Sequence, residues 1–225
     1  MSTSRLENQP RASIPSIRNE FSDLLHLDGN HLVNQVAYRW LGHGIREAKI
    51  FEMFISQNPQ ILSNRYQIEA VLKATTWHDI GKAEIAKHYG DLWSIPGKPT
   101  NEEWKIMELH PVVGAVMLDQ YYNKYPDAKS EIIIPLVLNH HEHFDGSGYP
   151  KGIKGEAIPP VARLLTIIDS FTAGVESRSY SSRETIEESL EYLYNHVKEF
   201  DPNYLNMVID FINSGALDDV SWILQ

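Results

Sequence analysis

The chain has 225 residues, 42% of them hydrophobic, and carries a formal net charge of −10. This length and composition suit a single globular domain with a sizeable core and exclude a disordered chain. The acidic balance and the lack of a Lys/Arg block argue against a partner that is a nucleic-acid polymer. No apolar run approaches the roughly 20 residues of a bilayer-spanning helix, so no membrane insertion is expected.

The sequence contains no cysteine. Disulfides and thiolate metal ligands are therefore excluded, and any metal site must be built from His, Asp and Glu. This composition fits a reducing compartment, and the polar start of the chain lacks the apolar segment of a signal peptide. We therefore expect a cytoplasmic location.

Helical periodicity runs through most of the chain, whereas period-two alternation is scarce, which predicts an all-α fold. Residues 1–30 are expected to form an N-terminal tail and an accessory helix, and residues 31–225 the main domain. Helices are predicted over residues 30–41 and 44–56, with His43 at their junction.

The next helix, residues 66–80, ends in His78-Asp79, and Gly81 is expected to stop it. Residues 83–100 are expected to be irregular. Thr100, with Glu103 three residues later, predicts a capped helix start.

His110 stands directly before Pro111, which is expected to open another helix. Residues 128–141 predict the helix that delivers the pair His140-His141, with a kink or break at Pro135. The following Gly- and Pro-rich loop, residues 142–160, is long for a compact domain, which favours a functional role.

Residues 161–175 are apolar nearly all round and predict a central helix with Asp169 in its middle. Two amphipathic helices, residues 184–200 and 201–212, are expected to complete the packing, with Asp201 as an N-cap.

Each polar residue in these helices also has an ordinary explanation. His78 could favour a helix dipole, His110 could be a satisfied core histidine, and Asp169 could pair with Arg163 or Arg178. All of these explanations holding at once is improbable, because most of the residues stand at helix ends or in an apolar interior, where unpaired polar groups are costly. The candidate metal ligands are His43, His78, Asp79, His110, His140, His141 and Asp169.

Seven nitrogen and oxygen ligands are about what two adjacent octahedral ions need, with a bridging carboxylate and waters. A mixture of imidazole and carboxylate favours Fe, Mn, Co, Ni or Zn over Ca. Two ions a few ångström apart suit the hydrolysis of a phosphate ester, because they stabilise charge on both the attacking and the leaving oxygen.

Two segments carry a resemblance to a known family. His78-Asp79-Ile80-Gly81-Lys82 resembles the HD motif of the HD phosphohydrolase superfamily, and the segment from His140 to Leu164 resembles the extended motif of its HD-GYP branch. Further matches, at residues 43–46, 102–104, 110–111 with 114–115, Arg178 with Tyr180, and 200–202, follow the order of the family. The resemblance covers most of residues 35–211.

The resemblance implies a compact all-α HD-domain bundle around a dinuclear metal site, occupying residues 31–225. It implies a cyclic di-GMP phosphodiesterase, which makes the linear dinucleotide, and in some members GMP, with a hydroxide that bridges the ions. Iron or manganese is the expected metal, with Ni, Co or Zn as alternatives. Two other readings stay open: an HD phosphohydrolase of another nucleotide, such as hybrid cyclic GMP-AMP, and a weakly active binding module.

By position, the resemblance assigns one ion to His43, His78, Asp79 and Asp169, and the other to Asp79, His110, His140 and His141. Catalysis would rest on Asp79 and Lys82.

Lys82 would lie near the scissile phosphate, and Arg178 would help to hold a phosphate. The loop residues Gly146, Gly148, Tyr149 and Pro150 are linked to substrate approach and to partner contact, for example with a diguanylate cyclase domain.

The chain departs from the family at three positions. Thr172 replaces a carboxylate, and Ser181 stands where a phosphate-binding cation is common. Some members bind a third metal through a glutamate one helical turn before the first histidine, but that position is Arg39 here, so two metals are predicted. Ligation should survive these changes, whereas substrate choice or affinity could differ.

Overall fold

The computed structural model describes residues 31–62, 64–175 and 186–217. The segment 1–30, expected to carry the accessory helix, lies outside the described residues, as do Arg178 and Ser181. The boundary predicted at residue 30 therefore stays a prediction.

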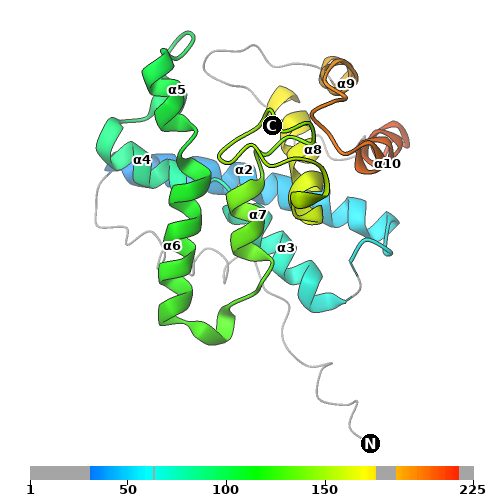
Figure 1. The fold of residues 1–225 in the computed structure, drawn as a ribbon, viewed down its shortest axis with the longest axis horizontal. Helices are drawn as coiled ribbons and strands as arrows, with labels where there is room; N and C mark the ends of the chain where they lie inside the picture. The colour runs from blue at the N-terminus through cyan, green and yellow to red at the C-terminus, as the bar shows by residue number, and fades with distance from the viewer. Residues whose placement is uncertain (1–30, 63, 176–185, 218–225) are drawn as a thin grey trace, which may run out of the picture.

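Within these ranges every regular element is helical, which confirms the all-α fold (Figure 1). The α-helices are α2 (His31–Gln57), α3 (Arg65–Trp77), α4 (Gly81–Tyr89), α5 (Asn101–Met107), α6 (His110–Lys124), α7 (Ile133–Asn139), α8 (Pro160–Val175), α9 (Ile186–Asn195) and α10 (Pro202–Asn213). Short 3-10 turns, η1 (Leu92–Ser94), η2 (Pro126–Ala128) and η3 (Gly155–Ala157), lie in the connections.

Helix α2 is the long element on which the bundle is assembled. It packs against α3, α4 and α8, while α6 and α7 lie side by side, α6 against α4 and α7 against α3 (Figure 1). The predicted interruption at His43 is wrong, because α2 continues through Gly42-His43-Gly44 without a break. Glycine costs a helix roughly 1 kcal/mol per residue, and the buried apolar face of α2, with Phe51 and Phe54 fully enclosed, outweighs this cost.

The region around the HD motif also differs from the prediction. Helix α3 ends at Trp77, not at Ile80, and Gly81 opens α4 where a helix stop was expected. The expectation of irregular structure after residue 82 is therefore wrong as far as Tyr89. A Cβ on Gly81 would lie 2.1 Å from the carbonyl oxygen of His110, so glycine is needed there for α4 to approach α6.

Several local signals are confirmed. Thr100 and Glu103 form a reciprocal capping box at the start of α5, Pro111 lies in the first turn of α6, and Asp201 caps α10 by accepting from Asn203 N. Helix α7 begins only at Ile133, so Pro135 lies in its first turn and causes no kink.

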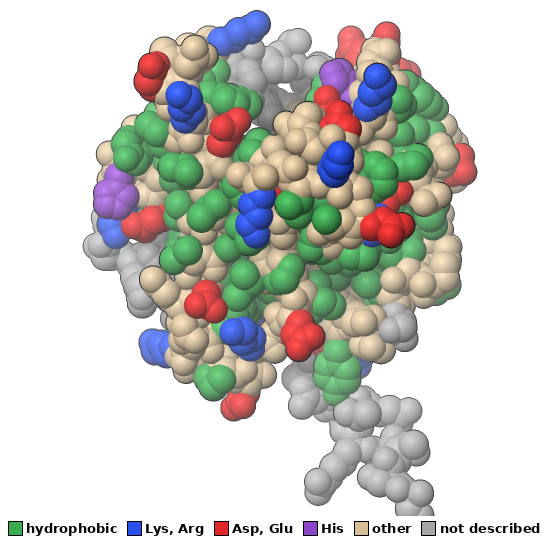
Figure 2. Space-filling model, in the orientation of Figure 1, with side chains coloured by type: hydrophobic (Ala, Val, Ile, Leu, Met, Phe, Trp, Pro, Cys, Tyr) green, Lys and Arg blue, Asp and Glu red, His purple; other side chains and the backbone are tan. Residues whose placement is uncertain are grey.

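Helix α8 is the central helix that its apolar sequence predicts, with Leu164, Leu165 and Phe171 buried. None of the described helices is long and apolar enough to cross a membrane. On the face shown in Figure 2, acidic and basic side chains are interspersed with apolar ones, and no patch of Lys and Arg alone is seen.

Candidate metal centre

Five parts of the fold bring the predicted metal ligands together. They are α2, the break between α3 and α4, the start of α6, the end of α7 and the middle of α8. His141 is half-buried, and the other six are buried. The seven residues gathered there are His43, His78, Asp79, His110, His140, His141 and Asp169.

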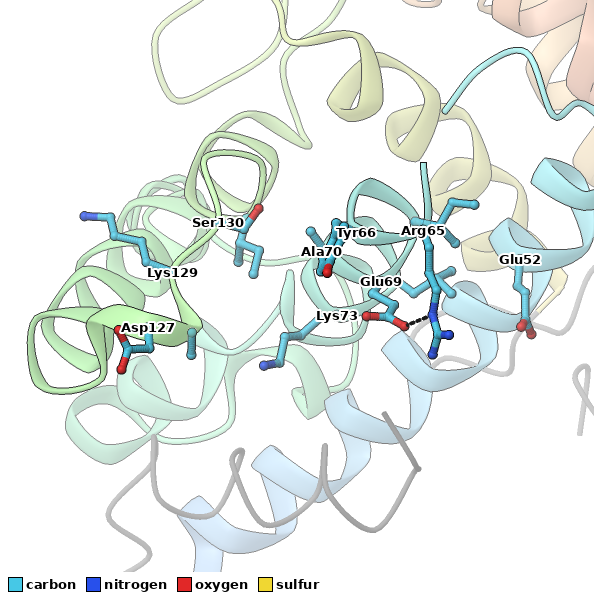
Figure 3. Close-up of a pocket in the computed structure, with 13 residues that line it drawn as sticks. Glu52, Arg65, Tyr66, Glu69, Ala70, Lys73, Asp127, Lys129 and Ser130 are labelled. Atoms are coloured by element: carbon cyan, nitrogen blue, oxygen red, sulfur yellow. Dashed lines mark hydrogen bonds and ion pairs between the residues drawn. The ribbon is translucent and has the colours of Figure 1, made fainter. Parts of the chain in front are cut away.

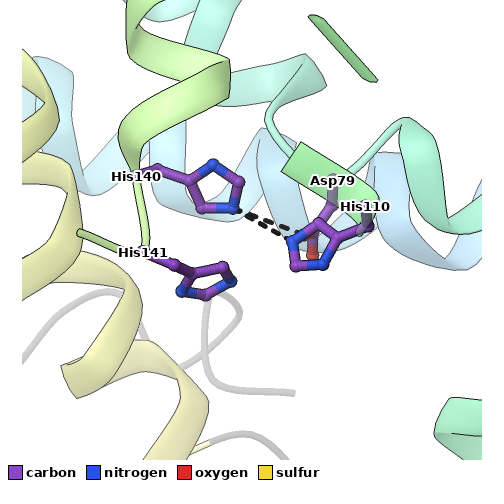
Figure 4. Close-up of side chains that lie close together, drawn as sticks. All are labelled: Asp79, His110, His140 and His141. Carbon is purple, nitrogen blue, oxygen red and sulfur yellow. Dashed lines mark hydrogen bonds and ion pairs between the residues drawn. The ribbon is translucent and has the colours of Figure 1, made fainter. Parts of the chain in front are cut away.

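One group consists of Asp79, His110, His140 and His141, whose side chains converge (Figure 4). The Nε2 atom of His110 lies 3.2 Å from Asp79 Oδ1 and 3.2 Å from His140 Nε2. An octahedral ion with bonds of about 2.1 Å holds neighbouring donors about 3.0 Å apart. These donors therefore stand at the spacing that one ion requires.

The second group consists of His43, His78, Asp169 and a further carboxylate, Glu47. The Nε2 atom of His43 lies 3.5 Å from Asp169 Oδ1. Asp79 also faces this group, because its Oδ2 lies 3.4 Å from His78 Nε2 and 4.0 Å from His43 Nε2.

Asp79 thus presents one carboxylate oxygen to each group. Oδ1 faces His110 and His140, and Oδ2 faces His78 and His43. This is the disposition of a carboxylate that bridges two ions.

Hydrogen bonds orient three of the imidazoles. The Nδ1–H groups of His78, His110 and His140 donate to the carbonyl oxygens of Thr75, Met107 and Val137 at 2.7, 2.8 and 2.7 Å. A carbonyl oxygen only accepts, so Nδ1 carries the proton and Nε2 is directed toward the centre. Outer partners of this kind fix the tautomer of metal-binding histidines.

The histidines of the centre differ in the direction of their pKa shifts. Burial lowers the pKa of His110, and it holds the pKa values of His140 and His141 well below the usual value, with neighbouring histidines adding to the effect. These three rings are therefore neutral at pH 7, the form that binds a metal.

His78 and Asp79 behave in the opposite way. Burial lowers the pKa of His78, but the carboxylates of Asp79 and Glu47 outweigh burial and raise this pKa to about 9. Burial also raises the pKa of Asp79, but His78 and Lys82 hold it well below its usual value. Asp79 is therefore an anion that attracts cations.

The donor set fits transition-metal ions. His78 Nε2 and Asp79 Oδ1 are buried and make no hydrogen bond within the described part of the chain. Buried polar atoms without such partners are costly, and ligation would satisfy both. Imidazole with carboxylate suits Fe, Mn, Co, Ni and Zn.

A small opening of about 120 Å³ leads to the centre, and Lys82 lines it. The Lys82 ammonium lies 2.5 Å from Asp79 Oδ2 and 3.4 Å from the ring centroid of Trp40. Trp93, Trp104 and Tyr149 also line the opening, beside His110, His141 and Asp169. Aromatic surfaces and one cation thus surround the accessible side of the cluster.

The loop that follows His141 packs onto the metal centre. The ring of Tyr149 lies 4.8 Å from that of His141, centroid to centroid, and Tyr149 N donates to His141 O. A Cβ on Gly148 would lie 2.3 Å from His141 O, so only glycine fits. The buried Glu142 accepts from Lys151 N at 2.7 Å and from Ile153 N at 3.0 Å, which secures the loop.

Three arginines also figured in the sequence predictions, and the structure describes two of them. Arg163 pairs with Asp201, so the alternative in which it neutralises Asp169 is wrong. Arg39 pairs with Asp91 at 2.6 Å. The phosphate-binding role of Arg178 stays a prediction, since that residue lies outside the described part.

Sequence reasoning missed Glu47, a fully buried carboxylate beside His43 and His78. Its signal was present, because position 47 is one helical turn after His43 on the same face of a helix. The predicted break at His43 hid this relation.

A second hollow, of about 640 Å³, lies among α2, α3 and the segment that leads into α7 (Figure 3). Charged residues of both signs line it, including Arg65, which donates to Glu69 at 2.7 Å. It shares no lining residue with the opening at Lys82.

The chain is similar to a known protein family and to several known proteins. A family model described as HD domain matches residues 30–204. A cyclic di-GMP phosphodiesterase response regulator of Xanthomonas campestris, RpfG, is 34% identical over 144 residues, which is 64% of this chain and 36% of that protein.

Two further relatives are named as phosphodiesterases of cyclic dinucleotides. A cyclic di-GMP phosphodiesterase of Thermotoga maritima is 36% identical over 116 residues, 52% of this chain and 30% of that protein. A 3'3'-cGAMP-specific phosphodiesterase 2 of Vibrio cholerae is 30% identical over 145 residues, 64% of this chain and 26% of that protein.

The match to each of these relatives thus covers about a third of their length or less. The family model covers most of the chain, and it includes all seven candidate ligands and the loop at Gly146–Pro150. The chain therefore belongs to the HD domain family, and its Gly148-Tyr149-Pro150 motif places it in the HD-GYP branch.

Proposed function

We propose that this chain is a metal-dependent phosphodiesterase that hydrolyses cyclic di-GMP to the linear dinucleotide. The observation that carries the proposal is the position of Asp79, with one oxygen toward each of two groups of buried ligands. The names of the relatives from X. campestris and T. maritima supply the substrate class.

In this proposal His43, His78, Asp79 and Asp169 hold one ion, and Asp79, His110, His140 and His141 hold the other. The bound ions would supply Lewis acidity that activates water and stabilises charge on the phosphate oxygens. Iron or manganese is the proposed metal, with Ni, Co and Zn as alternatives that the same donor types accept.

The chain's own residues would place the substrate. Lys82 lies at the opening and offers an ammonium group to a phosphate oxygen, where it stabilises the charge that develops there. Trp104 offers an aromatic face on which a guanine base can stack, and Trp40 and Trp93 line the opening beside it. Trp104, 48% exposed, is placed to meet a base first.

A second candidate substrate is hybrid cyclic GMP-AMP. The V. cholerae relative named as 3'3'-cGAMP-specific aligns over as much of this chain as RpfG does, and Thr172 replaces the carboxylate that the family commonly has. The third reading, a weakly active binding module, would use the Gly146–Pro150 loop to contact a partner such as a diguanylate cyclase domain. The cytoplasmic location stays a prediction from the sequence.

Product analysis tests these readings. Protein loaded anaerobically with Fe(II), or with Mn(II), is incubated with cyclic di-GMP and with 3'3'-cGAMP, and the products are resolved by chromatography. We expect the linear dinucleotide from cyclic di-GMP. Asp79→Ala should abolish the reaction, whereas Asp119→Ala, at an exposed position on α6, should leave it unchanged.

Each outcome selects one reading. Faster turnover of 3'3'-cGAMP would assign that substrate instead. Tight binding without product, from protein shown to hold two ions, would favour the binding module. Turnover that survives Asp79→Ala would contradict the proposed centre.

A further inference from the structure

Glu47 lies on α2 one turn after His43, with 0% of its surface exposed. Its Oε1 atom is 3.1 Å from His43 Nε2, and its Oε2 atom is 3.5 Å from His78 Nδ1. Glu47 thus borders two proposed ligands of one ion from within the protein interior.

The protein groups around Glu47 do not satisfy it. Thr172 donates to Oε1 at 2.6 Å, but Oε2 accepts no hydrogen bond among the described residues. The nearby His78 Nδ1 already donates to Thr75 O. A buried acceptor without a donor costs roughly 1–3 kcal/mol. A bound cation would remove this cost.

The donor spacing suits a cation shared with the second group. About 3.0 Å is expected between neighbouring donors of an octahedral ion, and about 4.2 Å between opposite donors. Glu47 Oε1 and His43 Nε2 are 3.1 Å apart, and His43 Nε2 and Asp169 Oδ1 are 3.5 Å apart. One donor atom from each of Glu47, His43, His78 and Asp169 lies within 4.8 Å of the others. We propose that Glu47 is a direct ligand of the ion that His43, His78 and Asp169 hold.

Thr172 makes room for this ligand. Its hydroxyl donates to Glu47 Oε1 and carries no charge, so a cation can approach the same carboxylate from the side of His43. An aspartate at position 172 would set a second carboxylate against Glu47, and the like charges would repel. Thr172, which stands where the family commonly has a carboxylate, is therefore the neutral neighbour that Glu47 requires in order to bind a cation.

The two sites consequently differ in their donors. Asp79 faces both groups. Besides Asp79, the Glu47 site combines two imidazoles with the carboxylates of Glu47 and Asp169, whereas the other group has three imidazoles. Oxygen donors suit Mn(II), whereas imidazole suits Zn, Ni and Fe. The Glu47 site should therefore take Mn(II) first, and the histidine-rich site should prefer Zn(II). This inference rests on the proposed metal-dependent function and deepens it.

Metal binding by variants tests the assignment. Glu47→Gln keeps the shape of the side chain and removes its charge, and Glu52→Gln on the same helix, where the side chain is 50% exposed, is the matched control. Mn(II) binding is followed by electron paramagnetic resonance and by metal analysis after dialysis. We expect two ions in the wild type and in Glu52→Gln. In Glu47→Gln one site should weaken by more than the roughly 10–100-fold that the loss of an outer partner of a ligand costs, while the other is unchanged.

Two Mn(II) ions bound with wild-type affinity in Glu47→Gln would overturn the inference and leave the proposed function standing. A wild-type protein that binds no metal would instead contradict the proposed function. If Glu47→Gln does not fold, a crystal structure of wild-type protein with Mn(II) bound decides the matter. A Glu47 oxygen at about 2.0–2.2 Å from the ion beside His43 supports Glu47 as a ligand, and a Glu47 carboxylate outside bonding distance of that ion overturns the inference.

Discussion

Three histidines of the centre use the same local arrangement. His78, His110 and His140 each donate Nδ1–H to the carbonyl oxygen three residues earlier. Carbonyls at a helix end lack partners within the helix, so these bonds satisfy the backbone while they orient the ring. Each histidine thus ends a helical turn and presents Nε2 to the centre.

The charge of His78 predicts a pH dependence of the metal-free protein. Its pKa is about 9 in the folded chain and near 6.5 when unfolded. The raised pKa contributes stability that is complete below pH 6.5 and is lost as the pH rises through 9. The loss amounts to roughly 3 kcal/mol.

Urea denaturation of the metal-free protein between pH 6.5 and 10 measures this effect. We expect the free energy of unfolding to fall over that range in the wild type but not in His78→Gln. His110, His140 and His141, whose pKa values are lowered, titrate below this window. An equal fall in both proteins would assign the effect to another group.

At the scale of elements, the break between α3 and α4 positions the HD motif. His78, Asp79 and Ile80 lie between the two helices, and Gly81 packs against the backbone of His110. The sequence predicted a helix here and the polar pair at its end. It did not predict that a new helix begins at Gly81. The reason for a glycine there is its close contact with the backbone of His110, 29 positions away, which the local sequence does not reveal.

Substitution of Gly81 should therefore disturb both packing and ligation. A Cβ in Gly81→Ala would meet His110 O and push α4 from α6, at a cost of about 1–3 kcal/mol in unfolding free energy. Gly42→Ala is the control, since a Cβ there has its nearest neighbour, the flexible end of Arg46, at 3.5 Å. We expect Gly42→Ala to be neutral or stabilising by about 0.5–1 kcal/mol.

Denaturant unfolding and Mn(II) affinity, measured on both variants, check this prediction. Gly81→Ala should lower both quantities, whereas Gly42→Ala should lower neither. A Gly81→Ala protein with the stability and metal affinity of the wild type would show that α4 can shift without cost.

At the scale of the whole molecule, the candidate ligands span positions 43 to 169 and join five parts of the bundle. Much of this could be predicted from the sequence, because the apolar periodicity located the main helices and polar residues at their ends stood out. Glu47 could not be found in the same way. A glutamate on a helix is usually exposed, and its burial depends on α3 and α8 packing over α2.

Metal removal should weaken the whole bundle. An ion at 100 times its dissociation constant adds about 2.7 kcal/mol to the stability of the folded state, which for a chain of this size raises Tm by roughly 5–11 °C. Thermal unfolding with Mn(II) and with a chelator measures the difference. Asp79→Ala, which removes the carboxylate that faces both groups, is the control and should respond less than the wild type. A chelator effect of equal size in both proteins would place the stabilising ion elsewhere.

The loop anchored by Glu142 has a consequence for the proposed contact with a partner protein. Glu142 holds the backbone of Lys151 and Ile153, and it is the residue next to His141. Tyr149, in the same loop, lies against the His141 ring. A protein that docked on this loop would therefore act on His141, a proposed metal ligand, across a single peptide bond. Regulation through this loop would need no relay across the core, since the chain itself and the contact between the Tyr149 and His141 rings join the loop to the candidate metal centre.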